Sequence, residues 1–200
     1  MRWMISVLCV CGVVLTTNGP ASGVGQTGRA TAGTFDYVLL STTRTSTLER
    51  EMNEAAEDGY RFKEVMGGNT AFGGSEVVAL MMRGSTPIGR FAYRLLATNQ
   101  TSTMQEEMQE AGSEGYRYRG QTVFESLFGG EEVVVIMERD DDVPPAQYDF
   151  LLLATSQTST LQTELAAAGQ RGFELEGLTV GSTAFGGDEV VAITSRARAR

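Results

Sequence analysis

Hydrophobic and polar positions follow one pattern that recurs three times between residue 35 and the end of the chain. Each copy opens with a run of aromatic, branched and leucine residues, at 35–40, 91–96 and 148–153, which predicts a strand. Apolar residues then recur at helical spacing and form one stripe, as Leu48, Met52 and Ala55 do. Two further strand-like runs follow, and the last contains a valine pair in every copy. The pattern predicts strand, helix, strand, strand in each copy.

Glycines divide the elements in the same way in all three copies. Gly59, Gly115 and Gly172 stand where a left-handed residue would end a helix at little steric cost. A glycine pair lies between the last two strand-like runs, at 73–74, 129–130 and 186–187, and predicts a tight hairpin. Each copy is therefore expected to place its last two strands side by side.

The copies align without an internal gap as residues 35–83, 91–139 and 148–196. We expect an α+β protein of three tandem βαββ repeats. A unit of about fifty residues without disulfide or metal buries little apolar surface alone, so the units should share surface. The linkers are too short for widely separated units. We expect one compact body with approximate three-fold symmetry, and a row of units is the alternative.

A Thr-Ser-Thr phrase precedes each helical stripe, with Glu or Gln three residues after the serine. This spacing predicts a capping box, in which Ser46, Ser102 and Ser159 accept from helix amides. The same hydroxyls and nearby carboxylates could instead hold an anion or a sugar at a helix start. The candidate residues of this second interpretation are the three serines together with Glu51, Glu107 and Glu164.

A second set of carboxylates begins the last strand of each copy, at Glu76, Glu132 and Glu189. With the first set they provide two carboxylates per copy, the minimum for acid/base hydrolysis of a glycosidic bond. Charges on a strand edge also discourage aggregation, which is the structural interpretation of the same residues. For Arg83, Arg139 and Arg196, at the strand ends, we expect either ion pairs or a role in holding the strand ends in solvent.

The N-terminus has the pattern of a secretory signal peptide over residues 1–23, with a basic start, an apolar run and small residues. The run at 3–15 is shorter than the roughly twenty residues of a membrane span. We expect residues 24–34 to be a disordered linker, and the exported chain to be periplasmic or extracellular, without a stable membrane span after cleavage.

Composition excludes several kinds of chemistry from the exported chain. Both cysteines lie in the signal peptide and histidine is absent, which excludes thiol and Ser/His/Asp catalysis and zinc sites of nitrogen and sulfur ligands. Asp140-Asp141-Asp142 lacks the spacing of a calcium loop. We therefore predict no cofactor and no metal. The net charge of −9 disfavours nucleic acid as a partner.

The third copy has an aromatic-x-aromatic strand, Tyr148-Asp149-Phe150, and a helix that runs into Gly169-Gln170-Arg171-Gly172-Phe173-Glu174-Leu175. These residues resemble a family of short, uncharacterised bacterial domains of unknown function. The resemblance covers all three copies and is closest in the third, and each copy has phenylalanine or tyrosine where the family has tryptophan. The resemblance implies a fold and no mechanism.

Two functions remain open from the sequence. The first is a non-catalytic, exported module that binds a protein or a small polar ligand, or acts as a scaffold. The alternative is a carboxylate-dependent hydrolase of a polysaccharide. Because the shared residues are explained by folding, we predict that the protein is not an enzyme.

Overall fold

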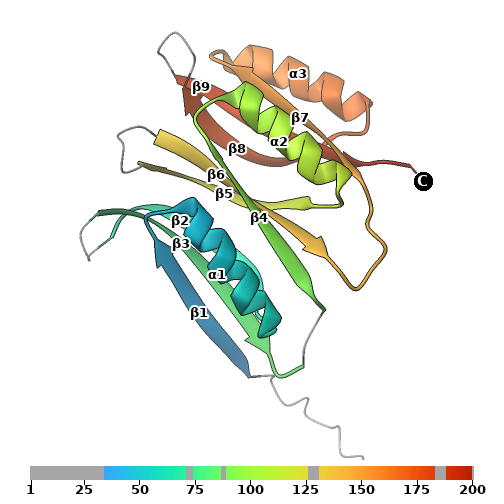
Figure 1. The fold of residues 1–200 in the computed structure, drawn as a ribbon. Helices are drawn as coiled ribbons and strands as arrows, with labels where there is room; N and C mark the ends of the chain where they lie inside the picture. Colours follow the sequence, from blue (N-terminus) through green and yellow to red (C-terminus); the bar gives the residue numbers. More distant parts are fainter. Residues whose placement is uncertain (1–33, 71–73, 87–88, 126–130, 183–187, 200) are drawn as a thin grey trace, which may run out of the picture. The chain divides into compact units, whose positions relative to one another are not determined.

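The computed structural model describes residues 34–70, 74–86, 89–125, 131–182 and 188–199 (Figure 1). The protein is α+β, and its described residues form three helices and three antiparallel sheets of three strands each. Segment 1 contains β1 (Phe35–Thr42), α1 (Thr45–Glu57), β2 (Arg61–Thr70) and β3 (Gly74–Gly84). Segment 2 contains β4 (Phe91–Thr98), α2 (Thr101–Ser113), β5 (Arg117–Glu125) and β6 (Glu131–Asp140). Segment 3 contains β7 (Tyr148–Thr155), α3 (Thr158–Gln170), β8 (Glu174–Ser182) and β9 (Asp188–Ala197).

In every sheet the last strand of the segment is central, with the orders β1-β3-β2, β4-β6-β5 and β7-β9-β8. The valine-rich run is therefore paired on both sides, which suits its branched side chains. The first strand of each segment is an edge strand. One of its edges has no strand partner, and this free edge determines how the segments meet.

The helix ends agree with the sequence pattern at one terminus and differ at the other. Gly59, Gly115 and Gly172 follow the helices with φ of 85°, 92° and 82°, so the predicted left-handed residues are confirmed. Only glycine adopts this conformation without a steric penalty.

The predicted capping boxes are wrong. Each helix begins at the threonine before the serine, and its N-cap is Arg44, Gln100 or Gln157, with no side-chain cap bond. The last threonine of the preceding strand organises the turn instead. Thr42 Oγ1 accepts from the Arg44 amide, Thr98 Oγ1 from Gln100 and Thr155 Oγ1 from Gln157, each at 3.1 Å.

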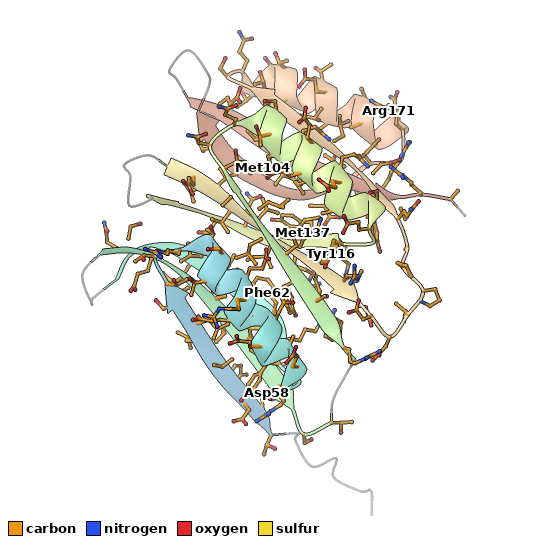
Figure 2. The ribbon with its side chains drawn as sticks, in the orientation of Figure 1. Asp58, Phe62, Met104, Tyr116, Met137 and Arg171 are labelled. Atoms are coloured by element: carbon orange, nitrogen blue, oxygen red, sulfur yellow. The ribbon has the colours of Figure 1, made fainter. Side chains whose placement is uncertain are left out.

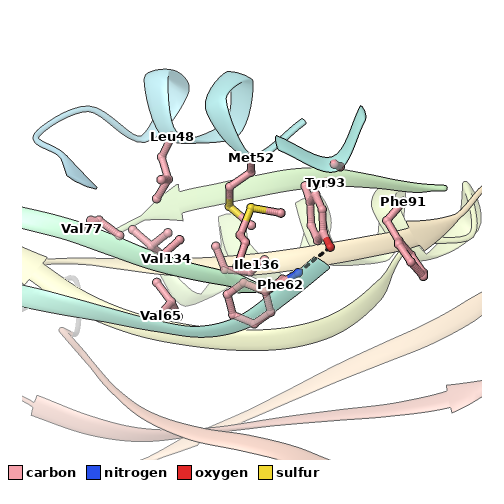
Figure 3. Packing of buried hydrophobic residues seen from close by; sticks show 12 residues of the cluster. Leu48, Met52, Phe62, Val65, Val77, Phe91, Tyr93, Val134 and Ile136 are labelled. Carbon is pink, nitrogen blue, oxygen red and sulfur yellow. Dashed lines mark hydrogen bonds between the residues drawn. The ribbon is translucent and has the colours of Figure 1, made fainter. Parts of the chain in front are cut away.

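In the described part of the chain, two clusters of buried side chains form the core, and each contains residues of two segments. In the first, Leu48 and Met52 of α1 and Phe62 of β2 pack with Tyr93 and Ile136 of segment 2 (Figure 3). In the second, Met104 and Met108 of α2 pack with Phe150 and Ile193 of segment 3. Neighbouring segments thus share apolar surface that neither would bury alone.

The expected three-fold body is wrong, and the alternative of a row agrees with the contacts. Elements of segment 2 pack extensively on those of segments 1 and 3, whereas no such packing joins segments 1 and 3 among the described elements. The physical reason is that each contact uses two different surfaces. Such a heterologous contact closes into a three-fold body only if the rotation between units is 120°.

Some predictions fall on residues that the structure does not describe. The signal peptide and nearly all of the 24–34 linker are among them, as are the hairpin turns around most of the glycine pairs. The strands that flank those turns are described and pair antiparallel, as expected of hairpins. No helix in the described part of the chain is long and apolar enough to cross a membrane.

Candidate functional site

The free edge of β4 is covered by side chains of the preceding helix, α1. The Tyr93 amide donates to Asn53 Oδ1 at 2.9 Å, and Asn53 Nδ2 donates to the Tyr93 carbonyl at 2.9 Å. One turn earlier on the helix, Glu49 Oε2 accepts from the Leu95 amide at 2.8 Å. These two side chains make the bonds that another strand would otherwise make. An edge covered in this way does not pair with other chains.

The same arrangement recurs at the free edge of β7, with glutamines of α2. The Leu152 amide donates to Gln105 Oε1 at 2.7 Å, and Gln105 Nε2 donates to the Phe150 carbonyl at 2.9 Å. Gln109 likewise accepts from the Phe150 amide at 3.1 Å. Glu49 and Gln105 are the residues that the capping box assigned to their own helix ends. The structure shows instead that they bind the next segment.

A buried carboxylate, Glu138 on β6, lies where segments 1 and 2 meet. Its side chain is fully buried. Arg61 of β2 donates to it from Nη2 at 2.7 Å and from Nε at 3.2 Å, and Arg117 of β5 donates at 3.0 Å. The Tyr93 hydroxyl donates to Glu138 at 3.1 Å and accepts from the Phe62 amide at 2.8 Å (Figure 3). The guanidinium of Arg119 is 3.6 Å from the carboxylate.

These neighbours keep Glu138 ionised. Burial alone would raise its pKa, but the hydrogen bond from Arg61, with Arg119 and Arg117, brings the pKa below its ordinary value. Burial raises the pKa of Tyr93 so that its hydroxyl stays protonated. Burial, with Glu176 and Glu64 nearby, raises the pKa of Tyr118 to about 12. A buried anion that is held ionised by cations is suited to joining segments and unsuited to donating a proton to a substrate.

The nine residues singled out from the sequence are distributed over the starts of helices and strands. Ser46, Ser102 and Ser159 are exposed in the first turns of the helices. Glu51, Glu107 and Glu164 are half-buried on the same helices, and Glu51 lies 3.7 Å from Arg50. Glu76 accepts from Ser41 at 3.0 Å within segment 1. Glu189 accepts from Thr101 of α2 at 2.8 Å, and so joins segments 2 and 3.

Glu132 is half-buried at the start of β6. Among the described residues, no three acidic, histidine or cysteine side chains lie close enough together to hold a metal ion. Asp142 is bonded to Arg90 at 2.8 Å and Asp141 to Arg139 at 2.7 Å. The arginines near the acidic run therefore bind two of its carboxylates.

Of the two roles expected for the arginines at the strand ends, ion pairing is confirmed. Arg83 pairs with Asp36 at 2.8 Å, Arg139 with Asp141 at 2.7 Å and Arg196 with Asp149 at 3.1 Å. Each guanidinium also lies over the aromatic residue that follows the helix-terminating glycine. The distances to the ring centres are 4.4 Å for Tyr60, 4.7 Å for Tyr116 and 4.6 Å for Phe173. Figure 2 labels Tyr116, Asp58 and Arg171 at this end of the segments.

The sequence reasoning did not single out Glu138, Asn53 or Gln109. A signal for Glu138 was present, because it follows Val134 and Ile136 at strand alternation and therefore belongs to a buried face. The corresponding positions are Met82 and Ser195 in the other segments, so the carboxylate is specific to segment 2. Asn53 and Gln109 lie beside the apolar stripe without any recognised motif.

Compared with known protein families, with curated proteins and with solved structures, the chain matches none of them.

Proposed function

We propose that the chain is an exported, non-catalytic scaffolding protein, built from three copies of one βαββ repeat that dock in a row. The gap-free alignment and the recurring element order support the repeat. The signal-peptide pattern supports export, and the resemblance of the third copy to a bacterial domain family supports a shared fold. The partner is a protein or a small polar ligand, and no cofactor is involved.

The observation that supports this function best is that many polar side chains bind other parts of the same chain. Five polar side chains that the sequence could have offered for chemistry bind the protein itself. Glu49, Asn53, Gln105 and Gln109 cover strand edges, and Glu138 is buried among arginines. In such a protein the side chains maintain an extended, ordered surface, which is what a scaffold needs.

An activity assay distinguishes the scaffold from the polysaccharide hydrolase. The purified chain is incubated with a panel of polysaccharides, and new reducing ends are measured beside the Glu51→Gln and Glu76→Gln variants. We expect the same background from all three proteins. Release of reducing ends by the wild type that either variant loses would overturn the scaffolding role in favour of the hydrolase.

Export and binding need separate measurements. Mass spectrometry of the exported chain should find a mature start near Ser22 or Val24, and an intact Met1 would contradict export. Capture from a cell-envelope extract should enrich a defined partner on the native chain. An unrelated protein of the same net charge is the control, because nonspecific capture by an acidic surface would be equal for both.

A further inference from the structure

The segments at the two ends of the row have uncovered surfaces, and these correspond to surfaces that are buried in the middle. The first is the β1 surface, formed by Phe35, Tyr37 and Leu39. Tyr37 is 57% exposed, whereas Tyr93, at the matching position of β4, is 3% exposed. Among the described side chains, none bonds to the free edge of β1 at Tyr37 or Leu39.

The second is the β8 surface, formed by Leu175, Leu178 and Val180 of segment 3. Leu175 is 52% exposed, whereas Phe62, at the matching position of β2, is 1% exposed beneath segment 2. The two surfaces contain six of the eight large hydrophobic side chains that are exposed in the described part of the chain. Exposed apolar side chains gathered in this way mark an interaction surface.

We propose that the β1 surface of one copy of the chain docks on α3 and the β8 surface of a second copy, as β4 docks on segment 1 and β7 on segment 2. The inference deepens the proposed scaffolding role by naming a partner. Its basis is continuity, because the chain already contains this contact twice. The uncovered surfaces are the two halves of a third contact of the same kind.

Several features of the inner contacts are retained at the ends. Gln162 of α3 matches Gln105, which bonds to the edge of β7. Tyr37 has the hydroxyl with which Tyr93 binds the Phe62 amide. Gly169 of α3 has nothing within 4 Å of an added Cβ, although a Cβ on its counterpart Gly112 would lie 2.5 Å from the Tyr148 carbonyl. Space for an approaching strand therefore exists beside α3.

Two features make the end contact weaker than the inner ones. Ala166 stands where Asn53 and Gln109 bond to the neighbouring strand, so one of the two helix side chains that cover the edge is lost. Glu64 stands where Gly120 and Gly177 let the ring of Phe62 or Tyr118 approach closely. Association should therefore be reversible and depend on concentration. Because the two surfaces differ, it adds copies head to tail.

Restoring the missing side chain should strengthen association. Sedimentation velocity over a range of concentrations compares the wild type with Ala166→Gln. The matched control is Ala167→Gln, since position 167 corresponds to the exposed Glu54 and Glu110. We expect Ala166→Gln to associate at a concentration at least about tenfold lower, the change that 1.4 kcal/mol gives, and the control to leave association unchanged. If both the wild type and Ala166→Gln stayed monomeric at all concentrations, the proposal would be overturned.

A mixing experiment tests the head-to-tail geometry. Leu39→Glu alters only the β1 surface and Leu175→Glu only the β8 surface, and both positions are exposed enough to accept a charge without unfolding. Each variant alone should lose association, whereas a mixture should form a dimer and no larger species. Val143→Glu, at an exposed position of the linker between β6 and β7 and outside both surfaces, controls for added charge and should associate like the wild type.

Association that survives both single variants, or a mixture that stays monomeric, would overturn the head-to-tail contact. Either result is distinguishable from failure of the scaffolding role. That role fails only if the chain cleaves a polysaccharide or captures no partner.

Discussion

Replacing Glu138 with glutamine should be among the most destabilising conservative changes in the protein. The substitution keeps the size of the side chain and removes its charge. In the native chain this carboxylate accepts bonds from Arg61, Arg117 and Tyr93. After the change, an amide that is both donor and acceptor faces guanidinium groups that only donate. The arginines then lose the anion that compensated their burial.

The size of the effect follows from the exposure of the three arginines. Breaking a buried pair by removing one partner costs about 3 to 5 kcal/mol. Arg117 and Arg119 have side chains that are 42% and 31% exposed, so water can compensate them in part, whereas Arg61 is 22% exposed. We therefore expect a loss of about 3 kcal/mol, a large part of the 5 to 15 kcal/mol that stabilises a typical domain.

Urea unfolding followed by circular dichroism measures this loss. The control is Asp36→Asn, which removes the partner of Arg83 in an exposed pair and should cost less than about 1 kcal/mol. Replacing Glu138 and Arg61 together with methionine should recover much of the loss, because buried pairs can be exchanged for apolar residues. A Glu138→Gln variant as stable as Asp36→Asn would refute the reasoning.

Three further predictions follow from the contacts. The pKa of Glu138 is lower in the folded chain than in the unfolded one. Its contribution to stability is therefore complete above about pH 4.5 and is lost as the pH falls through the folded-state pKa. Below pH 4.5, the free energy of unfolding should depend less on pH in Glu138→Gln than in the wild type. Thr98→Val should lower the free energy of unfolding by about 1 kcal/mol, whereas Ser102→Ala should leave it almost unchanged. A larger loss from Ser102→Ala than from Thr98→Val would support the capping box instead. Gly112→Ala should destabilise, because its Cβ would meet the Tyr148 carbonyl, whereas Gly169→Ala should raise the melting temperature slightly; equal effects would contradict the close approach of segment 3.

The elements could be predicted from the sequence because each depends on local periodicity or on a backbone requirement. Strand alternation, the apolar stripe beginning at Leu48 and the left-handed Gly59 are such features, and they are found where the pattern placed them. Helix starts were less predictable, since Ser46 and Glu49 fit a capping box but Glu49 has a stronger use elsewhere. When a side chain can bond either to its own helix or to a neighbouring strand edge, tertiary packing decides which of the two it binds.

The arrangement of the segments could not be predicted, because it depends on residues that are ordinary in sequence. Asn53 and Gln109 belong to no motif, and their importance is visible only when a strand edge lies beside them. Glu138 differs from them in having a visible pattern, but the three arginines that make its burial tolerable come from two different sheets. No spacing of residues within one copy predicts that these arginines will lie around Glu138.

In the proposed head-to-tail association, the two ends of the row limit how readily further copies add. Stacked repeats usually have terminal copies with polar outer faces, because an uncovered docking face would bind further copies. Here both end faces stay apolar, but each has lost one feature of the inner contacts, Asn or Gln at Ala166 and glycine at Glu64. Each change acts on one side of the same contact. Such partial loss fits an interface that is used reversibly better than one that has been abolished, because Leu175, Leu178 and Val180 keep the β8 surface apolar.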